Sequence, residues 1–258
     1  MKYLLSIIFI LFLVTNVQAK LHTEMVEYKD GDTVLEGYLA YDDAIKGKRP
    51  GVMVVHEWTG LGPYVKRRAN ELAELGYVAF SADIYGKGVR PKDHEEAARV
   101  SGIYFKDRSL MRARAQAGLQ VLRNHELTDK SRIAAMGYCF GGANVLELAR
   151  SGADIAGVVS FHGALATPNP EDARNIKAKV LVFHGSEDPF VPQEAVLAFQ
   201  NEMRKAGVDW QMVIYGGAVH SFTVPEAGND PSKGMAYNEK ADKRSWEMMK
   251  LFFKEIFR

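Results

Sequence analysis

The sequence predicts an α/β fold with a mostly parallel central sheet and helices on both faces, a three-layer α/β/α sandwich. Short apolar runs alternate along the chain with longer segments whose apolar residues recur at helical spacing. The apolar runs are continuous, which is typical of strands that are covered on both faces. Strands and helices that alternate in this way form a parallel sheet between two layers of helices.

The expected strands begin with an antiparallel pair, 25–28 and 34–41, which turns at Asp30-Gly31-Asp32. The short apolar runs that follow are expected to form the parallel part of the sheet, at 51–55, 78–82, 132–137, 156–161, 179–184 and 211–215. Active sites in such sheets form beyond the carboxyl ends of the strands. Candidate functional residues should therefore come directly after strands.

The expected helices lie between these strands, at 64–75, 94–104, 110–124, 141–150, 193–206 and 237–257. Gly76 and Gly207 follow two of them, and glycine is a common residue just after a helix end. The last helix places its large apolar residues at spacings of three and four, a stripe that faces the core. That stripe consists of Trp246, Met249, Phe253 and Ile256.

The chain opens with a segment that we interpret as a targeting signal. Lys2 precedes an apolar run over residues 3–14, and small residues lead to Ala19. This pattern is typical of a secretory signal peptide. An uncleaved membrane anchor is the alternative, but the run is shorter than the ~20 residues that a spanning helix needs. We therefore expect residues 1–19 to be removed and residues 20–258 to form a single domain, periplasmic or secreted.

The balance of charges argues against several classes of partner. The chain carries 33 Lys and Arg and 32 Asp and Glu, so the net charge is near zero. That balance gives no reason to expect binding to nucleic acid or stable association with a membrane. The spacing of potential ligands matches no metal site, and we expect neither a metal nor another cofactor. The sequence gives no indication of an oligomeric state.

Cys139 is the only cysteine and the strongest candidate for a functional residue. It is the centre of Gly137-Tyr138-Cys139-Phe140-Gly141, where an expected strand gives way to an expected helix. Such a tight turn strains the central residue and leaves room only for small residues two positions before and after it. The start of a helix favours a thiolate, which is a competent nucleophile. An inert buried cysteine beside a glycine turn is the alternative.

An acid and a base follow in the order that an α/β-hydrolase requires, after the nucleophile. Asp188 lies in a loop after the strand 179–184, and Pro189 stiffens that loop. Glu187 is the rival acid, and capping of the next helix is an alternative role for Asp188. His220 follows the strand 211–215 and is the only histidine after Asp188. We expect His220 to deprotonate Cys139 and Asp188 to orient His220.

The loop His56-Glu57-Trp58-Thr59-Gly60 follows the strand 51–55. In this fold that loop supplies one backbone N–H of the oxyanion hole, and the residue after the nucleophile supplies the other. The candidates are the N–H groups of Trp58 and Phe140. Glu57 is either a surface acid or a carboxylate close enough to Cys139 to control its protonation.

With these motifs in this order, the chain resembles the dienelactone hydrolase family over nearly all of its length after residue 25. The resemblance implies the triad Cys139, His220 and Asp188, and a Glu57 that keeps the resting thiol neutral. Family members of the lactone-cleaving type bind the substrate carboxylate with two arginines. This chain has Lys87, two residues after Tyr85, at the first position and Val224 at the second.

Tyr85 and Lys87 are therefore the candidate substrate contacts, and an acidic lactone is a poor fit. Residues 225–238 resemble an insertion that reshapes the mouth of the pocket. The leading functional hypothesis is hydrolysis of a small ester or lactone, of the carboxymethylenebutenolidase type, through an acyl-thioenzyme. An esterase or deacetylase for larger esters, such as those of carbohydrates, is one alternative. A binding protein on a hydrolase scaffold is another.

Overall fold

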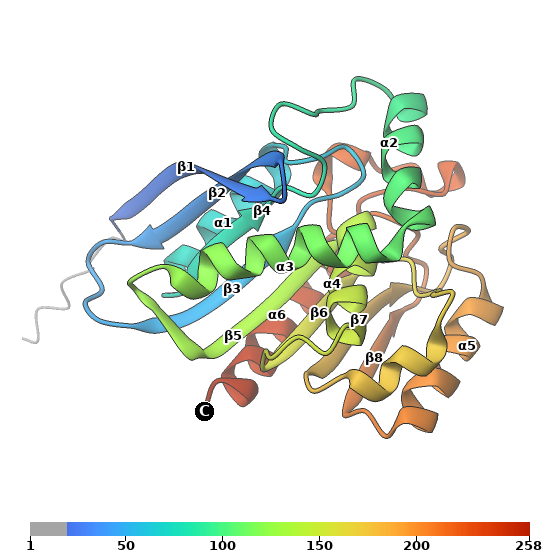
Figure 1. The fold of residues 1–258 in the computed structure, drawn as a ribbon. Helices are drawn as coiled ribbons and strands as arrows, with labels where there is room; N and C mark the ends of the chain where they lie inside the picture. The colour runs from blue at the N-terminus through green and yellow to red at the C-terminus, as the bar shows by residue number, and fades with distance from the viewer. Residues whose placement is uncertain (1–19) are drawn as a thin grey trace, which may run out of the picture.

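A computed structural model describes residues 20–258, which contain one eight-stranded sheet. The predicted signal peptide, 1–19, lies outside the described residues. In chain order the strands are β1 (Leu21–Asp30), β2 (Thr33–Asp42), β3 (Arg49–Val55), β4 (Val78–Ala82), β5 (Thr128–Tyr138), β6 (Gly157–Phe161), β7 (Lys179–Gly185) and β8 (Trp210–Tyr215). They are arranged in the order β1-β2-β4-β3-β5-β6-β7-β8 (Figure 1).

The pairing of the strands confirms the predicted sheet. β1 runs antiparallel to β2, and β2 runs antiparallel to β4. From β4 onward every neighbouring pair is parallel. The carboxyl ends of the parallel strands therefore meet at one edge of the sheet. At the other end of the chain order, the β1–β2 turn contains Gly31 with a φ of 56°, the left-handed region that glycine adopts readily.

Within residues 20–258, six α-helices complete the fold, and each lies within a few residues of a predicted one. They are α1 (Pro63–Glu74), α2 (His94–Lys106), α3 (Arg108–Asn124), α4 (Phe140–Arg150), α5 (Gln193–Ala206) and α6 (Glu239–Ile256). Three short 3₁₀ turns were not predicted: η1 (Pro170–Asn175), η2 (Pro225–Ala227) and η3 (Pro231–Lys233). Among residues 20–258, no helix is both long enough and apolar enough to cross a bilayer.

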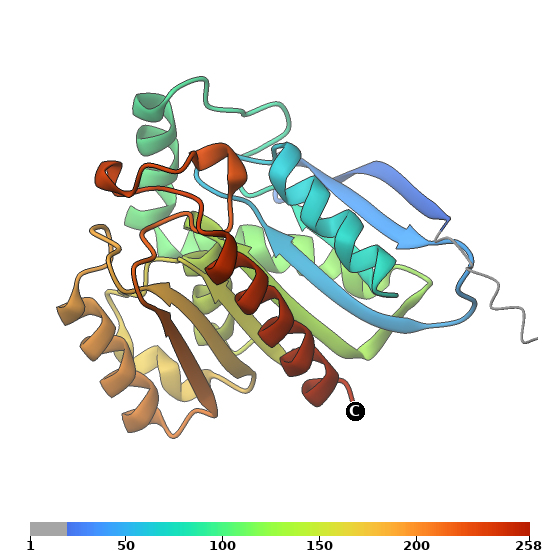
Figure 2. The same ribbon diagram turned by 180° about the vertical axis from the view of Figure 1, so that it is seen from behind.

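The helices cover both faces of the sheet and enclose two apolar cores. α3, α4 and α5 pack against one face (Figure 1). α1 and α6 pack against the other and cross the front of Figure 2 in cyan and dark red. The stripe predicted for the last helix behaves as expected, since Met249 and Phe253 are fully buried and Trp246 and Ile256 partly so. This confirms the three-layer architecture.

The turn from β5 to α4 is the tightest junction in this arrangement. A Cβ atom on Gly137 would lie 2.1 Å from the backbone oxygen of Gly141, and one on Gly141 would lie 2.2 Å from that of Val55. Both distances are far below van der Waals contact, and backbone atoms cannot swing away. The two glycines therefore allow α4 to begin directly against β3 and β5.

We predict that Gly137→Ala lowers the free energy of unfolding by at least about 3 kcal/mol, because the added methyl group overlaps the backbone of residue 141. Urea unfolding monitored by circular dichroism measures the change. Gly102→Ala is the matched control, since Gly102 lies within α2 and its Cβ would meet no atom within 4 Å. That control should gain about 0.5–1 kcal/mol from helix propensity. Equal effects of the two substitutions would contradict this account of the turn.

Candidate active site

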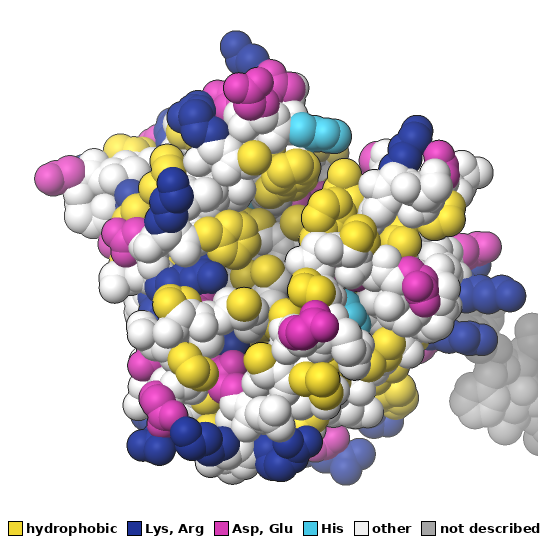
Figure 3. Space-filling model, turned by 90° about the vertical axis from the view of Figure 1, so that its right-hand side faces the viewer, with side chains coloured by type: hydrophobic (Ala, Val, Ile, Leu, Met, Phe, Trp, Pro, Cys, Tyr) yellow, Lys and Arg dark blue, Asp and Glu magenta, His cyan; other side chains and the backbone are white. Residues whose placement is uncertain are grey.

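The predicted catalytic residues meet at the edge of the sheet where the parallel strands end. Cys139 directly follows β5, Asp188 follows β7 and His220 follows β8. Figure 3 faces this edge and shows hydrophobic side chains gathered around a hollow. A cavity of about 250 Å³ opens there. It is lined by Trp58, Ser101, Phe105, Cys139, Phe140, Ala164, Phe190, Val191, His220 and Met235.

Cys139 occupies the strained position that the sequence pattern predicts. Its φ is 54° and its ψ is −114°, and it precedes the first residue of α4. Its backbone N–H donates to the carbonyl oxygen of Phe161 at 3.0 Å and to Nδ1 of His162 at 3.2 Å. Strained non-glycine residues are concentrated at functional sites. The side chain is partly exposed and lines the cavity. The alternative interpretation, an inert cysteine buried in the core, therefore does not apply.

Asp188, rather than Glu187, is the acid that contacts the histidine. Oδ2 of Asp188 lies 2.8 Å from Nδ1 of His220, and Oδ1 accepts the backbone N–H of Phe190 at 2.9 Å. Both Asp188 and His220 are buried. Glu187 is exposed, and its carboxylate accepts the hydroxyl of Ser186. No side chain caps α5, so capping does not occupy Asp188. The carboxylate is thus free to fix the tautomer and orientation of the imidazole.

The pKa of His220 reflects two opposed effects. Burial by itself lowers the pKa, because it disfavours the charged imidazolium. The negative charges of the Cys139 thiolate and of Asp188, together with hydrogen bonds to both, outweigh burial and raise the pKa to about 10. His220 is therefore well suited to take up a proton from Cys139.

Hydrogen bonds from the side chains of Tyr85 and His56 hold the loop after β3 in place. The hydroxyl of Tyr85 donates to the carbonyl oxygen of Trp58 at 2.9 Å. Nδ1 of His56 donates to the carbonyl oxygen of Glu57 at 2.6 Å, while Nε2 accepts the N–H of Ile84 at 3.2 Å. Burial lowers the pKa of His56 to about 4, so this imidazole is neutral. These bonds hold the backbone of the loop in one conformation.

Trp58 and Phe140 both line the cavity beside Cys139. Among residues 20–258, no protein acceptor receives a hydrogen bond from the backbone N–H of either residue. Phe140 is the first residue of α4, where N–H groups have no partner within the helix. Both donors are therefore available for an oxyanion, as the sequence predicts. The assignment of these two N–H groups to an oxyanion hole stays a prediction.

Glu57 lies beside a second, smaller cavity of about 190 Å³ and is not among the residues that line the first. Tyr64, Val224 and Glu226 also line this second cavity. Burial raises the pKa of Glu57 to about 7, although the positive charge of His220 opposes the rise. The carboxyl group is thus close enough to His220 for the charge of the imidazolium to act on it. Control of the thiol by Glu57 stays a prediction.

The structure does not bring Tyr85 and Lys87 into the cavity as substrate contacts. Tyr85 is buried beneath the loop, where it supports Trp58. Lys87 is on the surface, and its ammonium group pairs with Glu27 of β1 and Glu36 of β2. The residues that line the cavity include no Lys and no Arg. Among the described residues that line the cavity, His220 is therefore the only side chain that can carry a positive charge, and its imidazole is held by Asp188.

The segment 225–238 forms one wall of the cavity. The backbone N–H of His220 donates to the carbonyl oxygen of Gly234 at 3.2 Å, and the N–H of Ala236 donates to that of His220 at 3.1 Å. Met235, between those two residues, lines the cavity. This segment can therefore affect the shape of the pocket, because it contributes one wall and is hydrogen bonded to the backbone of His220.

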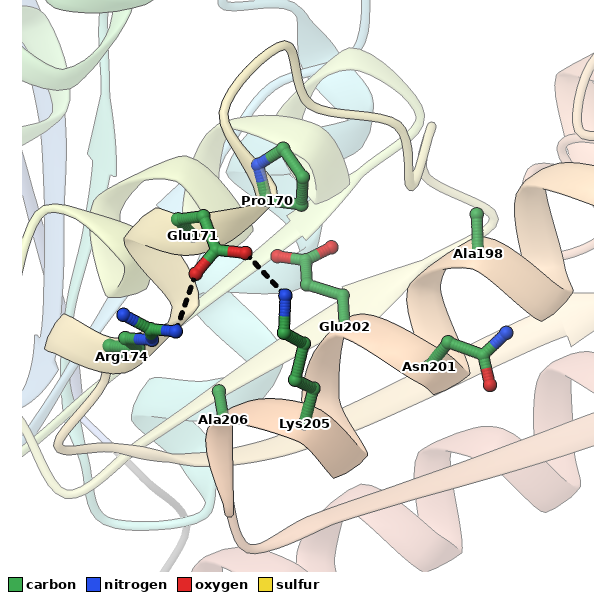
Figure 4. A pocket seen from close by; sticks show the side chains of 8 residues that line it. All are labelled: Pro170, Glu171, Arg174, Ala198, Asn201, Glu202, Lys205 and Ala206. Carbon is green, nitrogen blue, oxygen red and sulfur yellow. Dashed lines mark hydrogen bonds and ion pairs between the residues drawn. The ribbon is translucent and has the colours of Figure 1, made fainter.

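A third hollow, of about 250 Å³, lies away from these two cavities, between η1 and α5. Figure 4 shows that its charged side chains pair with one another, since Glu171 contacts both Lys205 and Arg174. Glu202 at its base is bound by Arg150. No nucleophile and no histidine line this hollow. The chemistry of the described residues is therefore concentrated at the Cys139 cavity.

His162 lies at this site, although the sequence patterns do not single it out. His162 is buried and contacts Cys139 and Thr223. The available signal was its position, because it directly follows β6 at the same edge of the sheet as the triad. Its partners could not be read from the sequence, since Thr223 is 61 residues away.

The sheet, the strained turn and the order of Cys139, Asp188 and His220 at the strand ends are those of an α/β-hydrolase. A family model for the dienelactone hydrolase family matches residues 35–257. The chain belongs to the dienelactone hydrolase family, and it is a hydrolase that acts on carboxylic esters or lactones.

Individual relatives cover nearly the whole chain. The "Putative carboxymethylenebutenolidase" of Aquifex aeolicus is 28% identical over 236 residues, which are 90% of this chain and 97% of that protein. A solved structure named m3DLH is 43% identical with a TM-score of 0.89, over 92% of this chain and 99% of its own. A dienelactone hydrolase-like promiscuous phosphotriesterase, P91 from metagenomic libraries, is 41% identical with a TM-score of 0.88. That match covers 93% of this chain and 100% of P91.

We predict that Glu57→Gln stabilises the protein at pH 9 and has little effect at pH 4. The pKa of Glu57 rises from 4.5 to about 7 on folding, so ionisation of this carboxyl opposes folding as the pH passes through that range. At pH 4 the carboxyl is mostly protonated in both states and resembles glutamine. The gain at pH 9 should be about 2–3 kcal/mol in urea unfolding.

Glu74→Gln is the control for that comparison, because Glu74 is an exposed residue at the end of α1. Its substitution should leave the free energy of unfolding nearly unchanged at both pH values. An equal gain for Glu57→Gln at pH 4 and pH 9 would show that the effect does not come from ionisation.

Proposed function

We propose that the protein hydrolyses small, uncharged carboxylic esters or lactones through Cys139, His220 and Asp188, by way of an acyl-thioenzyme. The observation that carries the proposal is the joint placement of the three residues. The strained Cys139 and His220 line one cavity, and the imidazole is held by Asp188 at 2.8 Å. A nucleophile, a base within the same cavity and a group that orients the base are the three parts of a nucleophilic hydrolase.

In the acylation half-reaction, the thiol of Cys139 gives its proton to Nε2 of His220. The sulfur then attacks the carbonyl carbon of the ester, and the carbonyl oxygen takes up the negative charge. The backbone N–H groups of Trp58 and Phe140 stabilise that oxyanion. The carbon–oxygen bond breaks, the alcohol leaves with the proton from His220, and a thioester remains on Cys139. When the substrate is a lactone, the alcohol stays attached to the acyl group.

In the deacylation half-reaction, His220 takes a proton from water, and the hydroxide adds to the thioester carbon. Collapse of the second tetrahedral intermediate breaks the carbon–sulfur bond and releases the carboxylic acid. The imidazolium of His220 then returns its proton to the thiolate of Cys139, which restores the starting thiol and the neutral imidazole. Asp188 stabilises the imidazolium in both halves, which agrees with the raised pKa of His220.

The lining of the cavity supports an uncharged substrate. Apart from the catalytic residues, it consists of aromatic and aliphatic side chains and one hydroxyl, that of Ser101. A carboxylate placed there would lose its hydration without gaining a Lys or Arg partner, which is costly. The same lining argues against a carbohydrate ester, because sugar hydroxyls would lack hydrogen-bonding partners. The alternative of a binding protein on a hydrolase scaffold is weakened by the strained backbone at Cys139, since binding alone does not require that strain.

A second candidate activity is hydrolysis of uncharged phosphotriesters. The relative P91, 41% identical to this chain, is named a promiscuous phosphotriesterase. An apolar cavity without a Lys or Arg side chain suits a neutral triester better than a charged phosphate ester. In such a reaction Cys139 would attack phosphorus instead of carbon. Assays with a neutral aryl phosphotriester and with the matching diester would test this candidate, which requires turnover of the triester alone.

We predict that Cys139→Ala lowers kcat/KM for p-nitrophenyl acetate by at least about 10³-fold while the protein stays folded, because the attacking atom is removed. Iodoacetamide should inactivate the wild-type protein in proportion to the labelling of Cys139, the only cysteine in the chain. Activity that survives complete alkylation would mean that another residue is the nucleophile.

We also predict a preference of at least about 30-fold in kcat/KM for p-nitrophenyl butyrate over mono-p-nitrophenyl succinate, whose acyl chain ends in a carboxylate. Met235→Lys should narrow this preference, because it places a cation at the cavity wall. Met235→Leu, of similar size and uncharged, should leave the preference unchanged. Equal rates for the two esters with the wild-type protein would contradict the proposed substrate class.

A further inference from the structure

Backbone strain in this protein is confined to the surroundings of the catalytic residues. Within residues 20–258, only three residues other than glycine have a positive φ: Cys139 at 54°, His162 at 41° and Ser221 at 57°. Cys139 is the proposed nucleophile, and Ser221 directly follows the proposed base. His162 has no part in the mechanism described so far. Such conformations persist only where the surrounding structure holds them, so the contacts of His162 require an explanation.

His162 connects the nucleophile turn to the loop that carries His220. Its Nδ1 accepts the backbone N–H of Cys139 at 3.2 Å, and its Nε2 lies 2.8 Å from the hydroxyl of Thr223. Because Nδ1 accepts a hydrogen bond, the proton of a neutral imidazole is on Nε2, which donates to Thr223. The ring packs edge-on against that of His220, with 5.2 Å between the centroids.

Thr223, at the other end of this connection, is anchored to α1, and α1 is in turn paired with α6. The hydroxyl of Thr223 lies 2.7 Å from that of Tyr64 on α1. Arg68, one turn further along α1, donates to the carbonyl oxygen of Thr223 at 3.2 Å and pairs with Asp242 on α6. Tyr64, Thr223 and Arg68 are buried. Thr223 is therefore a fixed point from which His162 can hold the turn at Cys139.

The loop of His162 also fits closely against the start of α4. A Cβ atom on Gly163 would lie 2.5 Å from the hydroxyl of Ser160 and 2.7 Å from the Cα of Gly142. The backbone of residue 163 thus has no room to shift toward the helix that begins at Phe140. A displacement of the imidazole would have to move Cys139 or the loop of His220.

His162 is not a second catalytic base. It does not line the cavity, and both of its ring nitrogens are engaged in hydrogen bonds. Burial and the neighbouring charge of His220 hold the pKa of His162 well below its usual range. A neutral imidazole at this place can accept from Cys139 and does not repel the imidazolium of His220.

We propose that His162 is a positioning residue that fixes the separation and the angle between Cys139 and His220, by bridging the backbone N–H of Cys139 to the hydroxyl of Thr223. This inference rests on the proposed function, because it takes Cys139 and His220 as the reacting pair. Small misplacements of reacting groups have large effects, since about 1 Å can change a rate about 10²-fold.

The test compares substitutions that remove one half of the bridge. His162→Asn preserves an acceptor near the Nδ1 position and a residue that tolerates positive φ, but it cannot reach Thr223. Thr223→Val removes the hydroxyl at nearly constant volume. Each should lower kcat for p-nitrophenyl acetate by about 10-fold or more while KM stays within about 2-fold. The double variant should lose little more than either single one, because both remove the same contact.

His162→Ala removes both halves and should lose more activity than His162→Asn, so asparagine gives a partial rescue that a purely structural role would not. Because the alanine variant can fail to fold, Thr223→Val and His162→Asn carry the test without it. His125→Asn is the control, since His125 is a partly buried histidine at the end of α3 and should keep its kcat. Thermal unfolding of each variant separates loss of folded protein from loss of turnover.

Unchanged kcat in folded His162→Asn and Thr223→Val would overturn the inference, as would fully additive losses in the double variant. Alkylation of the wild-type protein distinguishes this failure from failure of the proposed function. If activity survives complete labelling of Cys139, the proposed nucleophile is wrong, whatever the His162 variants do. If labelling abolishes activity while the His162 and Thr223 variants keep their kcat, only the positioning role is wrong.

Discussion

The close approach of backbone to backbone at the β5–α4 turn is the constraint on which the site depends. With no Cβ at Gly137 or Gly141, α4 begins within contact distance of β3 and β5. This turn forces Cys139 into a positive φ and directs its side chain into the cavity. The same turn leaves the N–H of Phe140 free at the start of a helix. The placement of the proposed nucleophile, of one proposed oxyanion donor and of the strain follows from the absence of two side chains.

The rest of the site is arranged by the ends of parallel strands. Three neighbouring or nearby strands, β5, β7 and β8, end at one edge of the sheet and are followed by Cys139, Asp188 and His220. His162 follows β6 and lies at the same edge. Buried hydrogen bonds then fix the orientation of each side chain, since a buried polar group without a partner would be costly. The apolar lining excludes water and strengthens the charge interactions that raise the pKa of His220. Catalytic geometry and substrate preference thus depend on the same edge.

Features that local sequence determines were predictable, and features that depend on distant segments were not. Continuous apolar runs and helical spacing located the strands and the helices, and the glycines around Cys139 identified the turn. Asp188 and His220 followed from chain order. By contrast, Lys87 pairs with Glu27 and Glu36 because of the twist and register of the β1–β2 hairpin, which no local pattern specifies.

The partner of His162 is likewise distant in the chain, and the position of Met235 depends on the path of the whole segment 225–238. The proposed export of the chain stays a prediction, because residues 1–19 are outside the described part. The measurement that tests the central claim most directly is rapid acid quenching of p-nitrophenyl acetate turnover, followed by mass spectrometry of the peptides. The account predicts one acetyl group on Cys139 that disappears as the substrate is exhausted. Turnover with the acetyl group on another residue, or with none on Cys139 at any quench time, would contradict it.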